Sequence, residues 1–181
     1  MIKRYIIAIF IITLNSCSTY KYIIGVDTNQ HIQTKPITKT IGVSQIDIPE
    51  YLLSGKIAIL KGNKIEYRDD GLWVDEINKR LQREIIRYIQ ERLPKSNIVE
   101  YPWSVSKLPD INIKIIITKF ISDGDKVELK STYKIYNKRF DKREIYQFKV
   151  VIKHKNSNEE IVKAMSLAFD KLSKSIYNKI Y

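Results

Sequence analysis

Few side chains of this 181-residue sequence are placed for catalysis. It contains two histidines, His31 in an expected loop and His154 at an expected strand end, and each is more typical of a surface residue than of an acid or base catalyst. Asp69 and Asp70 could bind a cation, but the following Gly71 makes them more typical of a turn. Serine-nucleophile, phosphate-loop and metal-ligand motifs are absent from the sequence. We therefore predict a protein without enzymatic activity, cofactor or metal site, with an exported hydrolase as the weaker alternative.

The one cysteine, Cys17, directly follows a segment with the layout of a secretory signal. Two basic residues precede an apolar run over residues 5–14, which is too short for a transmembrane helix of roughly 20 residues. The tetrapeptide Leu14-Asn15-Ser16-Cys17 resembles the bacterial lipobox, at which a signal peptide is cut before the cysteine. We therefore predict that residues 1–16 are a lipoprotein signal peptide.

Cleavage would leave Cys17 with a diacylglycerol on its sulfur and commonly a third acyl chain, such as palmitate, on its amine. Each buried methylene stabilises membrane binding by about 0.8 kcal/mol, so two or three chains hold a protein firmly on a bilayer. The alternative is an unmodified, buried structural cysteine. Because the signal-like features precede it, we predict that Cys17 is the lipidation site.

The charge of the chain predicts anionic partners. Without Lys3 and Arg4 of the signal, the chain has 30 basic and 20 acidic side chains, which gives a net charge of +10. Such a surface attracts anions, and for a lipoprotein these are phospholipid or lipopolysaccharide head groups and cell-wall polymers. Nucleic acid is not expected as a partner, because a secretory signal directs the domain out of the cytoplasm. The alternative is a genome-wide bias towards lysine that has no functional meaning.

The hydrophobic pattern predicts one α+β domain over residues 17–181, with two amphipathic helices. The first is expected over residues 74–93, where Ile77, Leu81 and Ile85 share a stripe. Pro94 ends it. The second is expected after a capping box and carries apolar residues at helical spacing: Ser157 and Glu160, then Ile161, Met165, Ala168, Leu172 and Ile176.

Alternation of apolar and polar residues predicts the strands. Three long ones would form an antiparallel meander with one buried face, so we expect a mainly antiparallel sheet with both helices packed on one face. The long strands are expected over residues 111–117, 127–135 and 146–152, and shorter ones over 20–26, 40–48, 56–60 and 64–68.

Three aromatic residues stand at the ends of expected elements. Trp73 precedes the first helix, where packing beneath the helix start is the favoured interpretation over a binding role. Tyr101 and Trp103 flank Pro102 in the connection between the first helix and the meander. Aromatic residues on loops are common interface anchors, so we predict that Tyr101 and Trp103 bind a partner, with a core role as the alternative.

Several of these segments together resemble the PqiC/YmbA-like lipoproteins, which are auxiliary components of ABC-type transport systems that work with MCE (mammalian cell entry) proteins. The resemblance rests on a strand motif, a proline with Tyr-Leu, a short hairpin and an aromatic residue before a helix: Ile41-Gly42-Val43, Ile48-Pro49-Glu50-Tyr51-Leu52, Ile57, Gly62-Asn63, Trp73 and the segment from Asp75 onward.

The resemblance implies a periplasm-facing lipoprotein of the outer membrane that docks an MCE protein and helps move phospholipid between the two membranes. Ser18 after the lipidated cysteine agrees with outer-membrane sorting, the inner membrane being the alternative. The competing interpretation is an outer-membrane lipoprotein that regulates or assembles cell-wall synthesis or another envelope machine. The long disordered linker that such activators often carry is not visible in the sequence.

Overall fold

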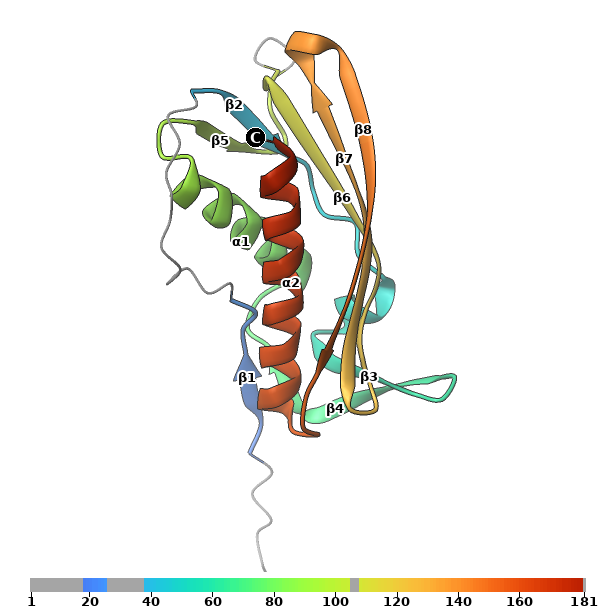
Figure 1. Ribbon diagram of the computed structural model, residues 1–181. Coiled ribbons are helices and arrows are strands. Elements are labelled where there is room, and N and C mark those ends of the chain that lie inside the picture. Colours follow the sequence, from blue (N-terminus) through green and yellow to red (C-terminus); the bar gives the residue numbers. More distant parts are fainter. Residues whose placement is uncertain (1–17, 26–37, 105–107, 181) are drawn as a thin grey trace, which may run out of the picture.

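The structure, a computed structural model, describes residues 18–25, 38–104 and 108–180, so the predictions for Cys17 and His31 lie outside the described residues. An eight-stranded sheet and two helices make up the fold (Figure 1). The strands are β1 (Tyr20–Tyr22), β2 (Thr40–Val43), β3 (Lys56–Lys61), β4 (Lys64–Trp73), β5 (Asn97–Glu100), β6 (Ile111–Asp123), β7 (Lys126–Asn137) and β8 (Lys142–Lys153); the helices are α1 (Ile77–Arg92) and α2 (Asn158–Ile180), with 3-10 turns η1 (Glu50–Ser54) and η3 (Lys138–Phe140).

Strand β6 organises the sheet because different strands pair along its two edges. β7 runs antiparallel along one edge over its whole length. The other edge pairs in parallel with β2 near its start, at Ile111, and with β3 near its end, at Ser122. The sheet is therefore mixed, although the long ladders of β6, β7 and β8 are antiparallel. This confirms the α+β prediction.

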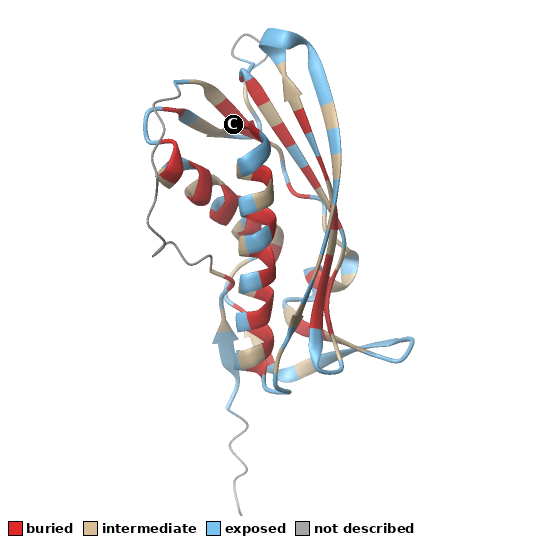
Figure 2. Ribbon diagram, in the orientation of Figure 1, coloured by how far each residue is buried: buried red, intermediate tan, exposed pale blue. Residues whose placement is uncertain are grey.

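The predicted meander is confirmed, and its alternation decides which face is buried. Inward-pointing residues of β6 and β7 are almost fully buried, while their neighbours point to the opposite face (Figure 2). A bulge between Ile117 and Lys119 shifts the register of β6. The side chains that these two strands contribute to the hydrophobic core are Ile111, Ile113, Ile115, Ile117, Phe120, Val127, Leu129, Tyr133 and Ile135.

Both helices cover the inner face of the sheet and form one hydrophobic core with it (Figure 1). α2 packs on the long strands through its apolar stripe, which includes Met165, Phe169 and Leu172. The predicted capping residue is confirmed at its start, where the backbone N–H of Glu160 donates to Ser157 Oγ at 3.2 Å.

Several boundaries differ from the predictions. Asp69 and Asp70 lie inside β4 rather than in a turn, because this strand continues to Trp73 and gains β1 as a parallel partner. The helix expected from residue 74 begins at Ile77. The strand expected over 40–48 ends at Val43. The Ser44 N–H still donates to the Ile113 carbonyl of β6, and the segment pairs with β6 again at an isolated bridge between Asp47 and Ile116.

Strand β5 was not predicted, since it is four residues long and shows no clear alternation. Trp73 is buried in the core at the end of β4, as expected from its place before the first helix.

Candidate functional site

The two predicted partner-binding aromatics, Tyr101 and Trp103, lie together after β5. Their rings meet edge to face with centroids 5.3 Å apart and an interplanar angle of 88°. Tyr101 is 52% exposed, and the peptide bond that joins it to Pro102 is cis. The backbone N–H of Tyr101 donates to the Val43 carbonyl at 3.1 Å, which ties the pair to β2.

Trp103 also has a structural contact that the sequence did not suggest. It lies over Gly42 of β2, where an added Cβ would come within 2.9 Å of the Trp103 ring and 2.6 Å of Pro109 Cγ. Any larger residue at position 42 would push these rings away, which explains the glycine in the Ile-Gly-Val motif. The side chain of Tyr101 is exposed, whereas Trp103 is half-buried and packs against β2.

A shallow cavity of about 560 Å³ opens beside this pair. Trp103 and Pro102 form part of its wall, and Leu108, which is 49% exposed, contributes another apolar surface. Such a surface is suited to an apolar side chain of a protein partner. The cavity is also lined by Thr40, Asn97, Val99, Glu100 and Ser104.

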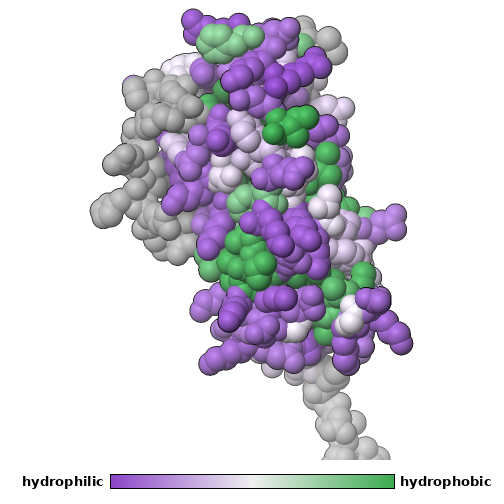
Figure 3. Space-filling model, turned by 45° about the vertical axis from the view of Figure 1, so that its right-hand side comes forward, coloured by the Kyte–Doolittle hydropathy of each residue, from purple (hydrophilic) through white to green (hydrophobic). Residues whose placement is uncertain are grey.

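The outer face of the meander is a second candidate surface, and it is strongly basic. Lysines on β7 stand directly opposite lysines on the neighbouring strands, in three cross-strand rows. Like charges directly opposite each other destabilise a sheet. A nearby negative charge would therefore stabilise these rows. Figure 3 brings the β8 side forward and shows hydrophilic residues with separate hydrophobic patches between them. The rows are Lys119–Lys130–Lys149, Lys114–Lys134 and Lys126–Lys153.

The middle row carries its own counterion, Glu128. Its carboxylate lies 2.7 Å from Lys119 Nζ, 3.2 Å from Lys130 Nζ and 3.3 Å from Lys149 Nζ, while its side chain is only 11% exposed. The hydrogen bond from Lys119, with those from Lys130 and Lys149, lowers the pKa of Glu128 to about 2 against the opposing effect of burial. The same carboxylate raises the pKa of Lys119.

The row at the β7–β8 connection is different. Lys114 pairs with the exposed Asp47 at 3.3 Å, but among the described residues neither Lys134 nor Arg143 has an ion-pair partner. Arg143 instead lies over the Tyr136 ring, 5.3 Å from its centroid. These side chains surround a cavity of about 340 Å³, which is also lined by Asn112, Ile135, Glu144 and Ile145.

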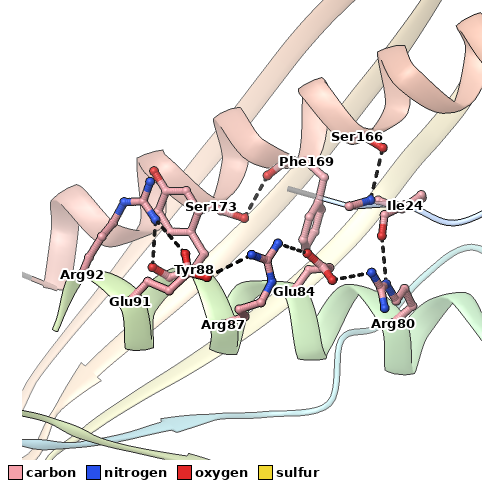
Figure 4. Close-up of polar contacts among 11 residues, drawn as sticks. Ile24, Arg80, Glu84, Arg87, Tyr88, Glu91, Arg92, Ser166, Phe169 and Ser173 are labelled. Carbon is pink, nitrogen blue, oxygen red and sulfur yellow. Dashed lines mark hydrogen bonds and ion pairs between the residues drawn. The ribbon is translucent and has the colours of Figure 1, made fainter. Parts of the chain in front are cut away.

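The segment that follows the predicted lipidation site is fixed to the fold. The Tyr22 carbonyl accepts a hydrogen bond from the Val74 N–H at 3.0 Å. Figure 4 shows the next contact, in which the Ile24 carbonyl accepts a hydrogen bond from Arg80 Nε at 2.8 Å. The Gly25 N–H donates to Ser166 Oγ of α2 at 3.3 Å. Residues 20–25 are thus held by β4, α1 and α2 together.

Arg80 is itself held in place by the buried Glu84. Its guanidinium lies 2.7 Å from one carboxylate oxygen, and Arg87 lies 2.6 Å from the other (Figure 4). Glu84 is 3% exposed and therefore depends on both partners for its charge to be tolerated. The pairs along α1 thus orient the group that holds the N-terminal segment.

The described residues offer little to an enzymatic mechanism. His154, predicted as a surface residue, is half-buried and bonds Ser122 Oγ through Nε2 at 3.0 Å and the Lys155 carbonyl through Nδ1 at 2.8 Å. Within residues 18–25, 38–104 and 108–180, histidine, aspartate and glutamate do not gather into a group of three that could hold a metal ion. Neither helix of this described part is long and apolar enough to span a bilayer.

The sequence carries a local signal for the basic face. Lys126, Lys130 and Lys134 recur at every fourth position and thus all point to the same face of a strand. The missing information was the register, which places them opposite the lysines of β6 and β8.

The fold defines an α+β domain whose N-terminal segment is held by β4, α1 and α2. The chain belongs to the family of ABC-type transport auxiliary lipoprotein components, whose model matches residues 24–177. This confirms the family resemblance found in the sequence. Membership implies membrane anchoring and association with an ABC-type transporter.

Two solved structures have the same fold. A crystal structure of an uncharacterized protein aligns with a TM-score of 0.73 and 14% identity, over 91% of this chain and 99% of its own. A protein from Xanthomonas campestris, of the DUF330 family, aligns with a TM-score of 0.73 and 12% identity, over 88% of this chain and 93% of its own. The comparison with curated proteins found no match.

Proposed function

We propose that this protein is a non-enzymatic component of an ABC/MCE-type intermembrane phospholipid transport system. Acyl chains on Cys17 would anchor it to the periplasmic side of the outer membrane, where its domain would dock an MCE protein and so support envelope integrity. The observation that carries the proposal is the family match over residues 24–177. The energy for transport would come from an ATPase elsewhere in the system.

The position of β1 supports a tethering role. Only Ser18 and Thr19 separate Cys17 from Tyr20, where the chain joins the sheet, so three residue-to-residue steps connect the two. At roughly 3.3–3.6 Å per residue they span at most about 11 Å. An acylated Cys17 would therefore hold the domain close to the bilayer, with the β1 end of the sheet nearest to it.

The aromatic pair supports a docking role for the connection after β5. Tyr101 is exposed and its ring packs against Trp103, which lines a partly apolar cavity; aromatic side chains at such positions often dominate binding energies. We therefore assign the contact with the MCE protein to Tyr101 and Trp103.

The proposal is tested by purifying the tagged, lipidated protein from membranes and identifying co-purifying proteins by mass spectrometry. We expect an MCE-domain protein, and we expect Cys17→Ser to release the domain from membranes and to abolish its support of envelope integrity. Recovery of a cell-wall synthase in place of an MCE protein would contradict the transport function. Full activity of the released domain would contradict the tether.

The aromatic contact is tested separately with two single variants. Tyr101→Ala should weaken co-purification of the partner at least tenfold and leave the melting temperature unchanged, because the side chain is largely exposed. Trp103→Ala should weaken it too but also lower the melting temperature, because the ring lies over Gly42. Leu167→Ala, which removes an exposed apolar side chain from α2, is the matched control.

A further inference from the structure

The cavity at the β7–β8 connection has the chemistry of an anion site with an apolar wall. Lys114 and Lys134 stand opposite each other on β6 and β7, and Arg143 follows on β8 in the next row. Ile145, which is 64% exposed, and Tyr136 add apolar surface beside these cations. Cavities of roughly 300–1,000 Å³ with mostly apolar walls and a few placed polar groups are typical of small-molecule sites.

The groups around this cavity leave two of its three cations without an internal ion pair. The Glu144 carboxylate pairs with Lys142 Nζ at 3.0 Å, and the Asp141 carboxylate accepts from Tyr136 Oη at 3.2 Å. Asp47 is exposed and holds only Lys114. Within the described chain, Lys134 and Arg143 therefore lack the internal counterion that Glu128 provides to the neighbouring row.

The cavity also lies far from the predicted anchor. β1 pairs with β4 at Gly71, and Gly71 lies next to Asn158 at the beginning of α2. β8 ends with Lys153 at this same end of the sheet (Figure 1). Arg143 is ten positions from Lys153 along β8, or about 33 Å at roughly 3.3 Å per residue. A ligand in the cavity would therefore not be a head group still embedded in the anchoring bilayer.

We infer that Lys114, Lys134 and Arg143 form a binding site for the phosphodiester head group of an anionic phospholipid. The phosphate would sit between the lysine pair and the guanidinium, whose planar donors suit two phosphate oxygens. Ile145 and Tyr136 would contact the first carbons of the glycerol and acyl chains. The inference rests on the proposed function, since a lipid reaches this distal site only if a transport partner delivers it.

The test measures binding of a short-chain anionic lipid to the lipidated full-length mature protein in phosphatidylcholine nanodiscs. Dihexanoyl phosphatidylglycerol is titrated by calorimetry, with dihexanoyl phosphatidylcholine, inorganic phosphate and empty nanodiscs as comparisons. We expect saturable binding of the phosphatidylglycerol, at least tenfold tighter than that of the phosphatidylcholine or of free phosphate. Equal affinity for inorganic phosphate would overturn the assignment to a lipid.

A matched pair of double variants distinguishes a specific lipid-binding site from general electrostatic attraction to the basic face. K134Q/R143Q should weaken phosphatidylglycerol binding at least tenfold. K126Q/K153Q removes the same charge from the same face at the opposite end of the strands and should weaken it less than twofold. Equal losses in both variants would overturn the site and leave only the attraction of a basic surface.

The same variants distinguish a failure of this inference from a failure of the proposed function. Co-purification of an MCE-domain protein is measured alongside lipid binding. If the partner is recovered but wild type shows no saturable phosphatidylglycerol binding, the lipid site is wrong and the transport role stands. If lipid binds as expected but no MCE protein is recovered, the docking function is wrong.

Discussion

Two rows of lysines on one sheet face show opposite solutions to the same electrostatic problem. At the middle of the meander, Lys119, Lys130 and Lys149 share the nearly buried carboxylate of Glu128. At the β7–β8 connection, Lys134 and Arg143 lack such a carboxylate among the described residues. The first cluster is thus built for stability, and the second keeps its charge for an external anion.

The largest effect is expected when the internal counterion is removed. Glu128→Gln leaves three lysines facing one another, so we expect the free energy of unfolding to fall by about 1–2 kcal/mol, between the values for exposed and for buried ion pairs. Urea unfolding followed by circular dichroism measures it. Glu144→Gln, which affects a more exposed carboxylate, is the control and should cost clearly less stability than Glu128→Gln does. Equal losses of stability in Glu128→Gln and Glu144→Gln would contradict the difference between the two regions.

The same cluster should give the protein a specific acid sensitivity. The folded-state pKa of Glu128 is about 2, below the ordinary value of 4.5. A lowered folded-state pKa contributes stability above the unfolded-state value, and this contribution is lost as the pH falls from about 4.5 to about 2. The stability difference between wild type and Glu128→Gln should therefore narrow across this window, which unfolding curves at several pH values would show. A difference independent of pH would mean that the carboxylate contributes by packing alone.

The smallest effect is expected at the distal row. Lys134→Gln removes one of two lysines that face each other, and because Lys134 has no ion pair within the described chain, stability should rise by about 0.2–0.5 kcal/mol. Lys130→Gln, in the neutralised row, should instead lower stability by about 0.5 kcal/mol because it loses Glu128. A loss of stability in Lys134→Gln would show that this lysine has a structural partner, which would weaken the case for a ligand site.

Much of the fold follows from local patterns, and the exceptions have a common cause. The prediction of the meander and of α2 rests on regular alternation over residues 111–117, 127–135 and 146–152 and on helical spacing over residues 161–176. The errors fall where distant segments extend or interrupt an element: β1 pairs with residues 71–73 and so keeps Asp69 and Asp70 within β4. Such pairings have no signal in the local sequence.

The candidate sites show the same division. The place of Tyr101 and Trp103 beside Pro102 predicts a partner-binding pair. The structure brings their rings together and adds a contact of Trp103 with Gly42 that the sequence does not indicate. The cluster of Lys114, Lys134 and Arg143 was not predicted, because its three members come from three strands and meet only through the register.

The α+β class, the two amphipathic helices, the meander and the family can all be predicted from the amino-acid sequence, because they depend on residue types at short spacing. The prediction that Cys17 carries lipid also comes from the sequence alone. The folded chain is needed to show which lysines face each other, which of them Glu128 neutralises, and that the remaining cations surround a cavity at the end of the sheet far from β1. The reason is physical: charge interactions depend on distances between side chains, and strand pairing sets those distances for residues far apart in the chain.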